Sequence, residues 1–169
     1  MTVVGAGGAW PSIMTSERID YDALAATTSI EDMNDDCEPS QETLRSLKSG
    51  RLLELQICNQ PMGVGEYGVF SDMELGWLGY FVKKNTSLVT FGIHGFNALK
   101  RCSEQAVDEF FNDLGRSSAR IEFVYFSFTN VLPGLIHKLG PVMKNNDITR
   151  WSFSNCSLGN PEVTSLFGL

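Results

Sequence analysis

Apolar residues recur in one pattern four times along the second half of the chain. Each copy has apolar residues at its first, fourth and sixth positions, and the pattern continues at its ninth and eleventh. The copies are Leu52-Leu55-Ile57-Gln60-Met62, Leu88-Phe91-Ile93-Phe96-Ala98, Ile121-Val124-Phe126-Thr129-Val131 and Ile148-Trp151-Phe153-Cys156-Leu158. They begin 27 to 36 residues apart, which favours a stacked repeat architecture. The alternation within each copy predicts strands near 53–58, 89–94, 122–127 and 149–154.

Segments with helical spacing lie between the predicted strands. The clearest one follows Ser103, a favourable N-cap residue, and ends at Gly115 with its apolar residues on one face. The others are a short helix capped by Ser40 that carries Leu44 and Leu47, a helix marked by Met73, Trp77, Leu78 and Phe81, a helix from Leu135 to Met143 that Gly140-Pro141 interrupts, and a final helix from about Pro161 to Phe167. Residues 60–71 and 97–102 are expected to form loops.

The alternation of strands and helices determines the expected fold class. Strands that are each followed by a helix return to the same end of the sheet, so they must pair in parallel. The chain is therefore expected to be an α/β protein with a repeat domain over residues 39–169. Residues 1–38 differ, because they combine a glycine-rich start, a short helical stretch near 18–26 and an acidic run at 31–36. We expect them to form an irregular N-terminal arm or partial cap.

The last repeat carries a resemblance to a known family. Its sequence, Ile148-Thr-Arg-Trp151-Ser-Phe153-Ser-Asn-Cys156-Ser-Leu158-Gly, matches the pattern LxxLxLxxCxL followed by glycine and a short helix. It resembles the ribonuclease-inhibitor-like class of leucine-rich repeat (LRR) proteins, over residues 45–169. The resemblance implies a solenoid of about four strand-helix repeats and a non-catalytic protein-binding or assembly module. Aromatic or β-branched residues often replace leucine, two repeats are longer than usual, and Gln60 is atypical. A generic α/β domain that mimics the pattern by chance is the alternative.

Side chains between the apolar positions are expected to form a second face of the sheet. Aligned copies give three columns: Glu54, Thr90, Phe123, Arg150; Gln56, Gly92, Tyr125, Ser152; and Cys58, His94, Ser127, Ser154. Aromatic residues beside arginine are enriched at binding hot spots. The predicted protein-binding residues are Glu54, Gln56, His94, Phe123, Tyr125, Arg150 and Ser152. Alternatively, the aromatic pair is covered by the N-terminal arm or packs against itself.

Two other functions remain open. Cys58 and His94 are adjacent in the third column, and a thiol beside an imidazole is the arrangement of a cysteine-based hydrolase or transferase. The sequence identifies no orienting third residue and no oxyanion donor for this pair. The chain could also be a structural subunit of a large complex, because the apolar residues of 163–169 would leave the C-terminal edge of the solenoid uncovered. A partner chain, a second copy or further repeats would cover that edge.

Composition narrows the classes of partner. Thirteen Lys and Arg against twenty Asp and Glu give a formal charge of -7, which disfavours nucleic acid and anionic lipid. No apolar stretch approaches the ~18 residues of a membrane-spanning helix. Four scattered cysteines without CxxC spacing favour reduced thiols in a cytoplasmic, intracellular location.

Motifs for cofactors and metals are weak. The glycines at 5–8 lack the spacing of a dinucleotide loop, and the acidic run lacks the alternating ligands of a calcium loop. The two histidines, His94 and His137, form no recognisable zinc set with the cysteines. We therefore expect no cofactor and no metal site.

Overall fold

A five-stranded parallel sheet forms the centre of the computed structural model, which describes residues 19–34, 37–129 and 133–156 apart from the side chains of residues 133, 134 and 136. The strand order is β2-β1-β3-β4-β5. The strands are β1 (Glu54–Cys58), β2 (Glu66–Gly68), β3 (Thr90–His94), β4 (Phe123–Ser127) and β5 (Arg150–Ser154). The chain therefore has the predicted α/β fold with parallel strands.

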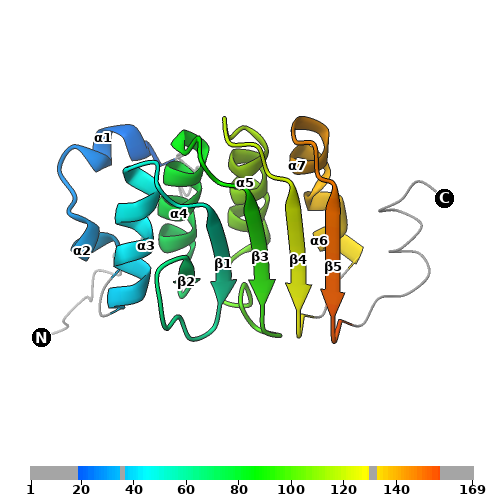
Figure 1. The fold of residues 1–169 in the computed structure, drawn as a ribbon. Helices are drawn as coiled ribbons and strands as arrows, with labels where there is room; N and C mark the ends of the chain where they lie inside the picture. Colours follow the sequence, from blue (N-terminus) through cyan, green and yellow to red (C-terminus); the bar gives the residue numbers. More distant parts are fainter. Residues whose placement is uncertain (1–18, 35–36, 130–132, 157–169) are drawn as a thin grey trace, which may run out of the picture.

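The helices of the described residues gather on one face of the sheet (Figure 1). They are α1 (Tyr21–Ala25), α2 (Ile30–Met33), α3 (Glu38–Lys48), α4 (Asp72–Lys84), α5 (Glu104–Gly115), α6 (Pro133–Lys138) and α7 (Gly140–Asn145). Figure 1 shows α3, α4, α5 and the α6–α7 pair behind the strands, with α1 and α2 beside them. The opposite face of β1, β3, β4 and β5, which we call the open face, carries no helix of the described residues.

Helix boundaries follow local capping chemistry. Ser103 caps α5 as predicted, because its hydroxyl accepts a hydrogen bond from the Ala106 N–H at 3.2 Å. The predicted cap at Ser40 is wrong. Helix α3 begins at Glu38, and the buried Ser40 hydroxyl accepts a hydrogen bond from the Gly68 N–H of β2 at 3.0 Å. The predicted interruption at Gly140-Pro141 is confirmed by the break between α6 and α7.

The predicted register of β1, β3, β4 and β5 is confirmed. Glu54 pairs with Thr90, Thr90 with Phe123, and Phe123 with Arg150, and the other two columns continue this alignment. The apolar positions between the columns face the helices. The fully buried residues of this core include Leu55, Ile57, Phe91, Ile93, Val124, Phe126, Leu78, Phe110 and Phe111.

Some apolar residues of the pattern lie outside the core. Met62 and Phe96 are 86% and 55% exposed, because both follow the ends of their strands, where the chain leaves the sheet. Met73 is also exposed on the first turn of α4, which buries Leu75 and Leu78 instead. Three expectations lie outside the described residues: the helix over 161–167, the positions Val131 and Leu158, and the placement of residues 1–18 and 35–36.

The backbone repeats one hydrogen-bond arrangement where strands begin. Two successive N–H groups donate to a single carbonyl of the preceding strand segment, at 2.8 to 3.2 Å. The donor pairs and acceptors are Val89 and Thr90 with Leu53, Glu122 and Phe123 with Val89, and Thr149 and Arg150 with Glu122. Neighbouring strands therefore start in equivalent geometry.

The backbone also repeats its conformation where strands end. Gly95, Phe128 and Asn155 each follow the last residue of a strand, and their φ angles are 104°, 50° and 52°. The N–H groups of Gly95 and Phe128 donate to Ser127 and Ser154 on the next strand, at 2.9 and 2.8 Å. A residue in the left-handed backbone conformation thus adds one hydrogen bond beyond the end of the strand, both between β3 and β4 and between β4 and β5.

Strand β2 lies within the segment 60–71 that was expected to be a loop. It pairs in parallel with β1 at the edge of the sheet. The Thr43 hydroxyl accepts a hydrogen bond from the Gly65 N–H and donates one to the Glu66 carbonyl, both at 2.9 Å. Its three residues are too short to show an alternating pattern, so sequence periodicity missed this strand.

The described part of the N-terminal arm packs against the helices. Met33 is buried, and α2 contacts α3 and α4. Ion pairs join Glu31 to Arg45 at 2.5 Å and Asp22 to Lys84 at 2.6 Å. The short helix expected near 18–26 is confirmed as α1. Within the described ranges, no helix has the length and apolar character needed to cross a lipid bilayer.

Candidate protein-binding face

The open face brings the seven predicted binding residues together. Five of them line a shallow hollow of ≈ 380 Å³, and Phe126, Ser127 and Ser154 complete its lining. Those five are Gln56, His94, Phe123, Tyr125 and Ser152. The other two, Glu54 and Arg150, contact Tyr125 and Phe123 respectively from the outer strands. The columns predicted from the sequence therefore form one continuous surface.

Tyr125 lies flat across the neighbouring strand β3. A Cβ atom at Gly92 would lie 2.1 Å from the Cζ atom of the tyrosine ring, so only glycine leaves room for it. The hydroxyl group of Tyr125 reaches β1, where it donates a hydrogen bond to Gln56 Oε1 at 2.6 Å and lies 3.2 Å from Glu54 Oε1. Burial and the Glu54 carboxylate raise the pKa of Tyr125. The ring is therefore held in one position before any partner binds.

An aromatic and arginine cluster continues the open face toward β5. The Phe123 and Tyr125 ring centroids are 5.6 Å apart. The Arg150 guanidinium carbon lies 4.9 Å from the Phe123 ring centroid, which is within the range of a cation–π interaction. The two aromatic rings do pack against each other, as the alternative interpretation expected, yet both still line the hollow.

Sequence reasoning missed Phe128 at the lower end of this face. Phe128 is 43% exposed, and its ring centroid lies 5.5 Å from that of His94. Phe128 follows the last residue of β4, so the alternating pattern that identified the other residues has ended there. No signal in the sequence marks its left-handed backbone, which is uncommon for a bulky residue.

Cys58 and His94 are adjacent in the sheet, but their surroundings oppose a catalytic role. Cys58 is 3% exposed, and burial together with the Glu66 carboxylate raises the pKa of its thiol. A nucleophilic cysteine needs the opposite shift. No hydrogen bond joins these two described side chains, and the His94 ring contacts Phe128 instead.

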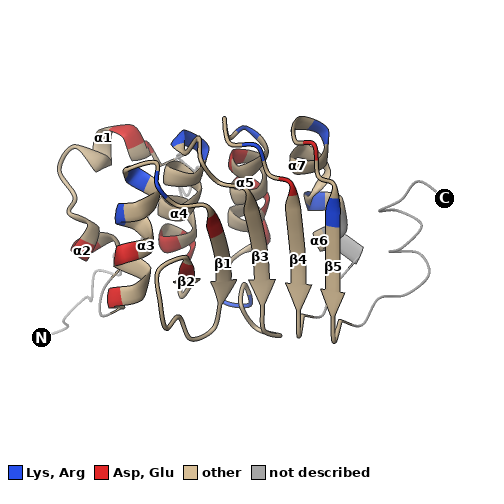
Figure 2. Ribbon diagram, in the orientation of Figure 1, with Lys and Arg blue, Asp and Glu red and all other residues tan. Residues whose placement is uncertain are grey.

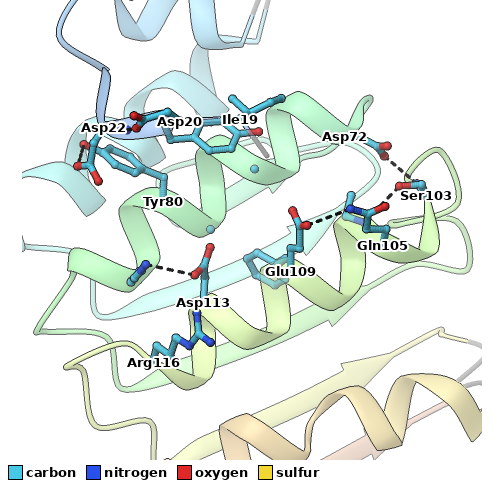
Figure 3. Close-up of a pocket in the computed structure, with 16 residues that line it drawn as sticks. Ile19, Asp20, Asp22, Asp72, Tyr80, Ser103, Gln105, Glu109, Asp113 and Arg116 are labelled. Carbon is cyan, nitrogen blue, oxygen red and sulfur yellow. Dashed lines mark hydrogen bonds and ion pairs between the residues drawn. The ribbon is translucent and has the colours of Figure 1, made fainter. Parts of the chain in front are cut away.

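A second hollow of ≈ 580 Å³ lies on the helix side, between α1, α4 and α5 (Figure 3). Figure 3 shows acidic side chains along both walls. The charged residues of its lining are Asp20, Asp22, Asp72, Glu109, Asp113, Lys83 and Arg116.

Polar contacts within the protein use most of those carboxylates. Asp72 accepts a hydrogen bond from the Ser103 N–H at 2.7 Å, and Asp113 lies 3.6 Å from Lys83. No group of three His, Cys, Asp or Glu side chains within the described ranges is arranged to hold a metal ion. Sequence reasoning missed this groove because it forms only when α1 packs against α4.

Comparison with known proteins does not extend this description. None of the known family models matches the chain, and no curated protein matches it. The functional argument therefore depends on the geometry of the open face.

Proposed function

We propose that this chain is a non-catalytic protein-binding module, built as a solenoid of the leucine-rich repeat type, that binds its partner through the open face. The observation that carries the proposal is a parallel sheet that the described helices cover on one side only. Parallel sheets occur almost only with both faces covered. Solenoids are an exception, because they leave one face of the sheet free as an extended binding surface.

The repeated backbone geometry supports the solenoid. The same two-donor arrangement begins β3, β4 and β5, and a left-handed residue follows each of these strands. Strand β1 pairs with β3 in the same register in which β3 pairs with β4 and β4 with β5, so β1 is aligned with the other three strands. We propose four repeats, of which β1, β3, β4 and β5 are the strands, and we propose that β2 belongs to an insertion in the first.

The side chains of the open face support the binding role. Phe123, Tyr125 and Arg150 are of the residue types that dominate binding energy at protein interfaces. Tyr125 is already fixed by Gly92 and Gln56, so binding a partner costs little of its conformational entropy. The raised thiol pKa of Cys58 favours this role over the cysteine-enzyme alternative.

Site-specific photocrosslinking tests the proposal. One variant carries p-benzoylphenylalanine at Ser152, on the open face, and a matched variant carries it at Glu42, an exposed position on α3. After illumination in native extract, we expect discrete protein adducts from position 152 and none of the same mass from position 42. Adding Phe123→Ala to the first variant should remove these adducts. Equal adducts from both positions, or none from 152, would contradict the proposal.

A further inference from the structure

The charged side chains of the open face lie at its two ends. Glu54 is on β1 and Arg150 is on β5, and both belong to the same row of the parallel ladder. Thr90 and Phe123 lie between them in that row. Figure 2 shows acidic colour on β1, basic colour at the start of β5, and neither on the arrows of β3 and β4; Glu122 adds acidic colour directly before β4 begins at Phe123. The face is therefore acidic at one end and basic at the other.

The distance between these ends sets a length scale for a ligand. Neighbouring strands are ~4.8 Å apart, so the three steps from β1 to β5 span ~14 Å. An extended polypeptide advances ~3.3 Å per residue and covers this span in about four residue steps.

The hollow lies between the two charged ends. Its lining combines the rings of Phe123, Tyr125 and His94 with Ser127 and Ser152. Because Tyr125 is held over Gly92, the hollow exists before a partner arrives. A surface of aromatic rings and small hydroxyl groups suits an apolar or aromatic side chain.

We propose that the open face binds an extended polypeptide segment that lies across the strands, with a Lys or Arg over β1, an Asp or Glu over β5, and an apolar side chain in the hollow. This inference rests on the proposed function and specifies the partner's chemistry. Exposed ion pairs add little affinity, but they fix orientation, because the reversed segment would meet like charges at both ends.

A displayed library of random dodecapeptides, selected against the whole chain, supplies the probe. The most enriched peptide is synthesised, and its Kd is measured by fluorescence anisotropy. We expect Glu54→Arg and Arg150→Glu each to weaken binding roughly tenfold, since each converts an attraction into a repulsion. The double variant should recover most of that loss, because the peptide can bind in the reversed orientation. Glu42→Arg and Lys48→Glu on α3 change net charge equally and should leave Kd unchanged.

Orientation gives a second readout. A nitroxide at the basic end of the peptide should broaden the NMR signals of β1 in the wild type and those of β5 in the double variant. Broadening of the same strand in both proteins would overturn the proposal. So would losses that add in the double variant, equal losses in the α3 controls, or a library that yields no enriched peptide. Circular dichroism of each variant confirms that it is folded.

Two further outcomes separate the possible failures. The first outcome is a dimer, detected by sedimentation, that each single variant abolishes and that an equal mixture of the two restores. That result would assign the face to a second copy and overturn the segment proposal. The second outcome is a partner that crosslinks at Ser152 but binds equally well when Glu54 or Arg150 is reversed in charge. In that case the proposed protein-binding function stands, and the proposed segment with a basic and an acidic end is wrong.

Discussion

A tyrosine ring lies on a glycine on each side of the molecule. On the helix side, a Cβ atom at Gly76 of α4 would lie 1.8 Å from the Tyr21 hydroxyl oxygen. On the open face, a Cβ atom at Gly92 would lie 2.1 Å from the Tyr125 ring. The first contact attaches α1 to α4, and the Tyr21 ring also meets Trp77 edge-on, with centroids 4.8 Å apart. The second contact attaches nothing further, and Tyr125 remains part of the surface.

The surroundings of the two rings explain this difference. Around Tyr21 the protein supplies its own partners, as in the contact of Asp22 with Lys84 and Tyr80. The Tyr125 hydroxyl donates a hydrogen bond to Gln56, but no described helix or strand covers the Tyr125 ring. A tyrosine ring packed on a glycine therefore stabilises the fold on the helix side and forms part of the proposed binding surface on the open face. The predictions below test this contrast, from the largest expected effect to the smallest.

Removing an aromatic ring should cost much more stability on the helix side of the sheet than on the open face. Phe91 is fully buried and contacts Phe110 and Phe111, with ring centroids 5.9 and 6.1 Å away. We expect Phe91→Ala to lower the free energy of unfolding by about 3 to 5 kcal/mol, as other buried phenylalanines do. Urea denaturation followed by circular dichroism measures this loss.

Phe123→Ala is the matched control on the open face. Phe123 is partly exposed, and its main described contacts are Tyr125 and the Arg150 cation. We expect a loss of about 1 kcal/mol, the scale of one partly solvated cation–π contact. The variant should nevertheless lose partner crosslinking at Ser152. A loss equal to that of Phe91→Ala would show that the open face is part of the core.

The strand register could be predicted because it depends on a period of two within each copy. Aligning Leu55, Phe91 and Val124 places every intervening residue in its column without knowledge of tertiary contacts. The placement of Tyr125 over Gly92 was also readable in principle, since the two share a column and an aromatic ring often covers a neighbouring glycine in a sheet.

Other parts of the structure depend on contacts between distant segments. The sequence around Ser40 is typical of a helix cap. In the structure, however, the Ser40 hydroxyl accepts a hydrogen bond from the Gly68 N–H of β2, 28 residues along the chain. The helix-side groove requires Tyr21 to approach α5 and Gly76, and nothing in the local sequence fixes that approach. Local patterns predicted β1, β3, β4, β5 and the main helices, whereas contacts between distant segments determined β2, the role of Ser40 and the helix-side groove.

A methyl group beneath Tyr125 should release the ring. Gly92→Ala leaves no space for the present position, so the ring must leave β3 and its hydrogen bond to Gln56 is lost. We expect a destabilisation of about 1 kcal/mol, the value of one such hydrogen bond. Because burial and Glu54 raise the pKa of Tyr125, its ionisation should move to lower pH in the variant. Ultraviolet difference titration at alkaline pH measures this shift, and an unchanged titration would contradict the placement of the ring.

The equivalent change beneath Tyr21 should alter local order more than global stability. Gly76→Ala gains up to ~1 kcal/mol of helix propensity within α4. Displacing Tyr21 from Trp77 loses an aromatic contact of about the same size, so the two effects nearly cancel. We expect faster amide exchange across α1 with little change in the denaturation midpoint. Unchanged exchange in α1 would show that Tyr21 does not attach this helix.

Acid should loosen α1 while leaving the hydrogen bond between Tyr125 and Gln56 on the open face unchanged. Hydrogen bonds from Lys84 and Tyr80 lower the pKa of the exposed Asp22 carboxyl, and the hydrogen bond to Asp22 raises the pKa of Lys84. A lowered carboxyl pKa gives stabilisation that is present above the unfolded value near 4 and is lost as pH falls through the folded value. The raised lysine pKa sets the other limit, because its contribution is lost as pH rises beyond about 10.4.

Carboxyl NMR titration of Asp22 measures the acid limit directly. In the wild type we expect its midpoint below that of an ordinary aspartate, and Lys84→Met should raise it. Amide exchange in α1 should accelerate over the same pH range. The hydrogen bond between Tyr125 and Gln56 should not respond, because neither the hydroxyl nor the amide ionises under acid. Only the longer contact of that hydroxyl with the Glu54 carboxylate, at 3.2 Å, involves an ionisable partner. Equal midpoints for Asp22 in both proteins would show that this ion pair does not hold α1, and would leave Tyr21 on Gly76 as its main attachment.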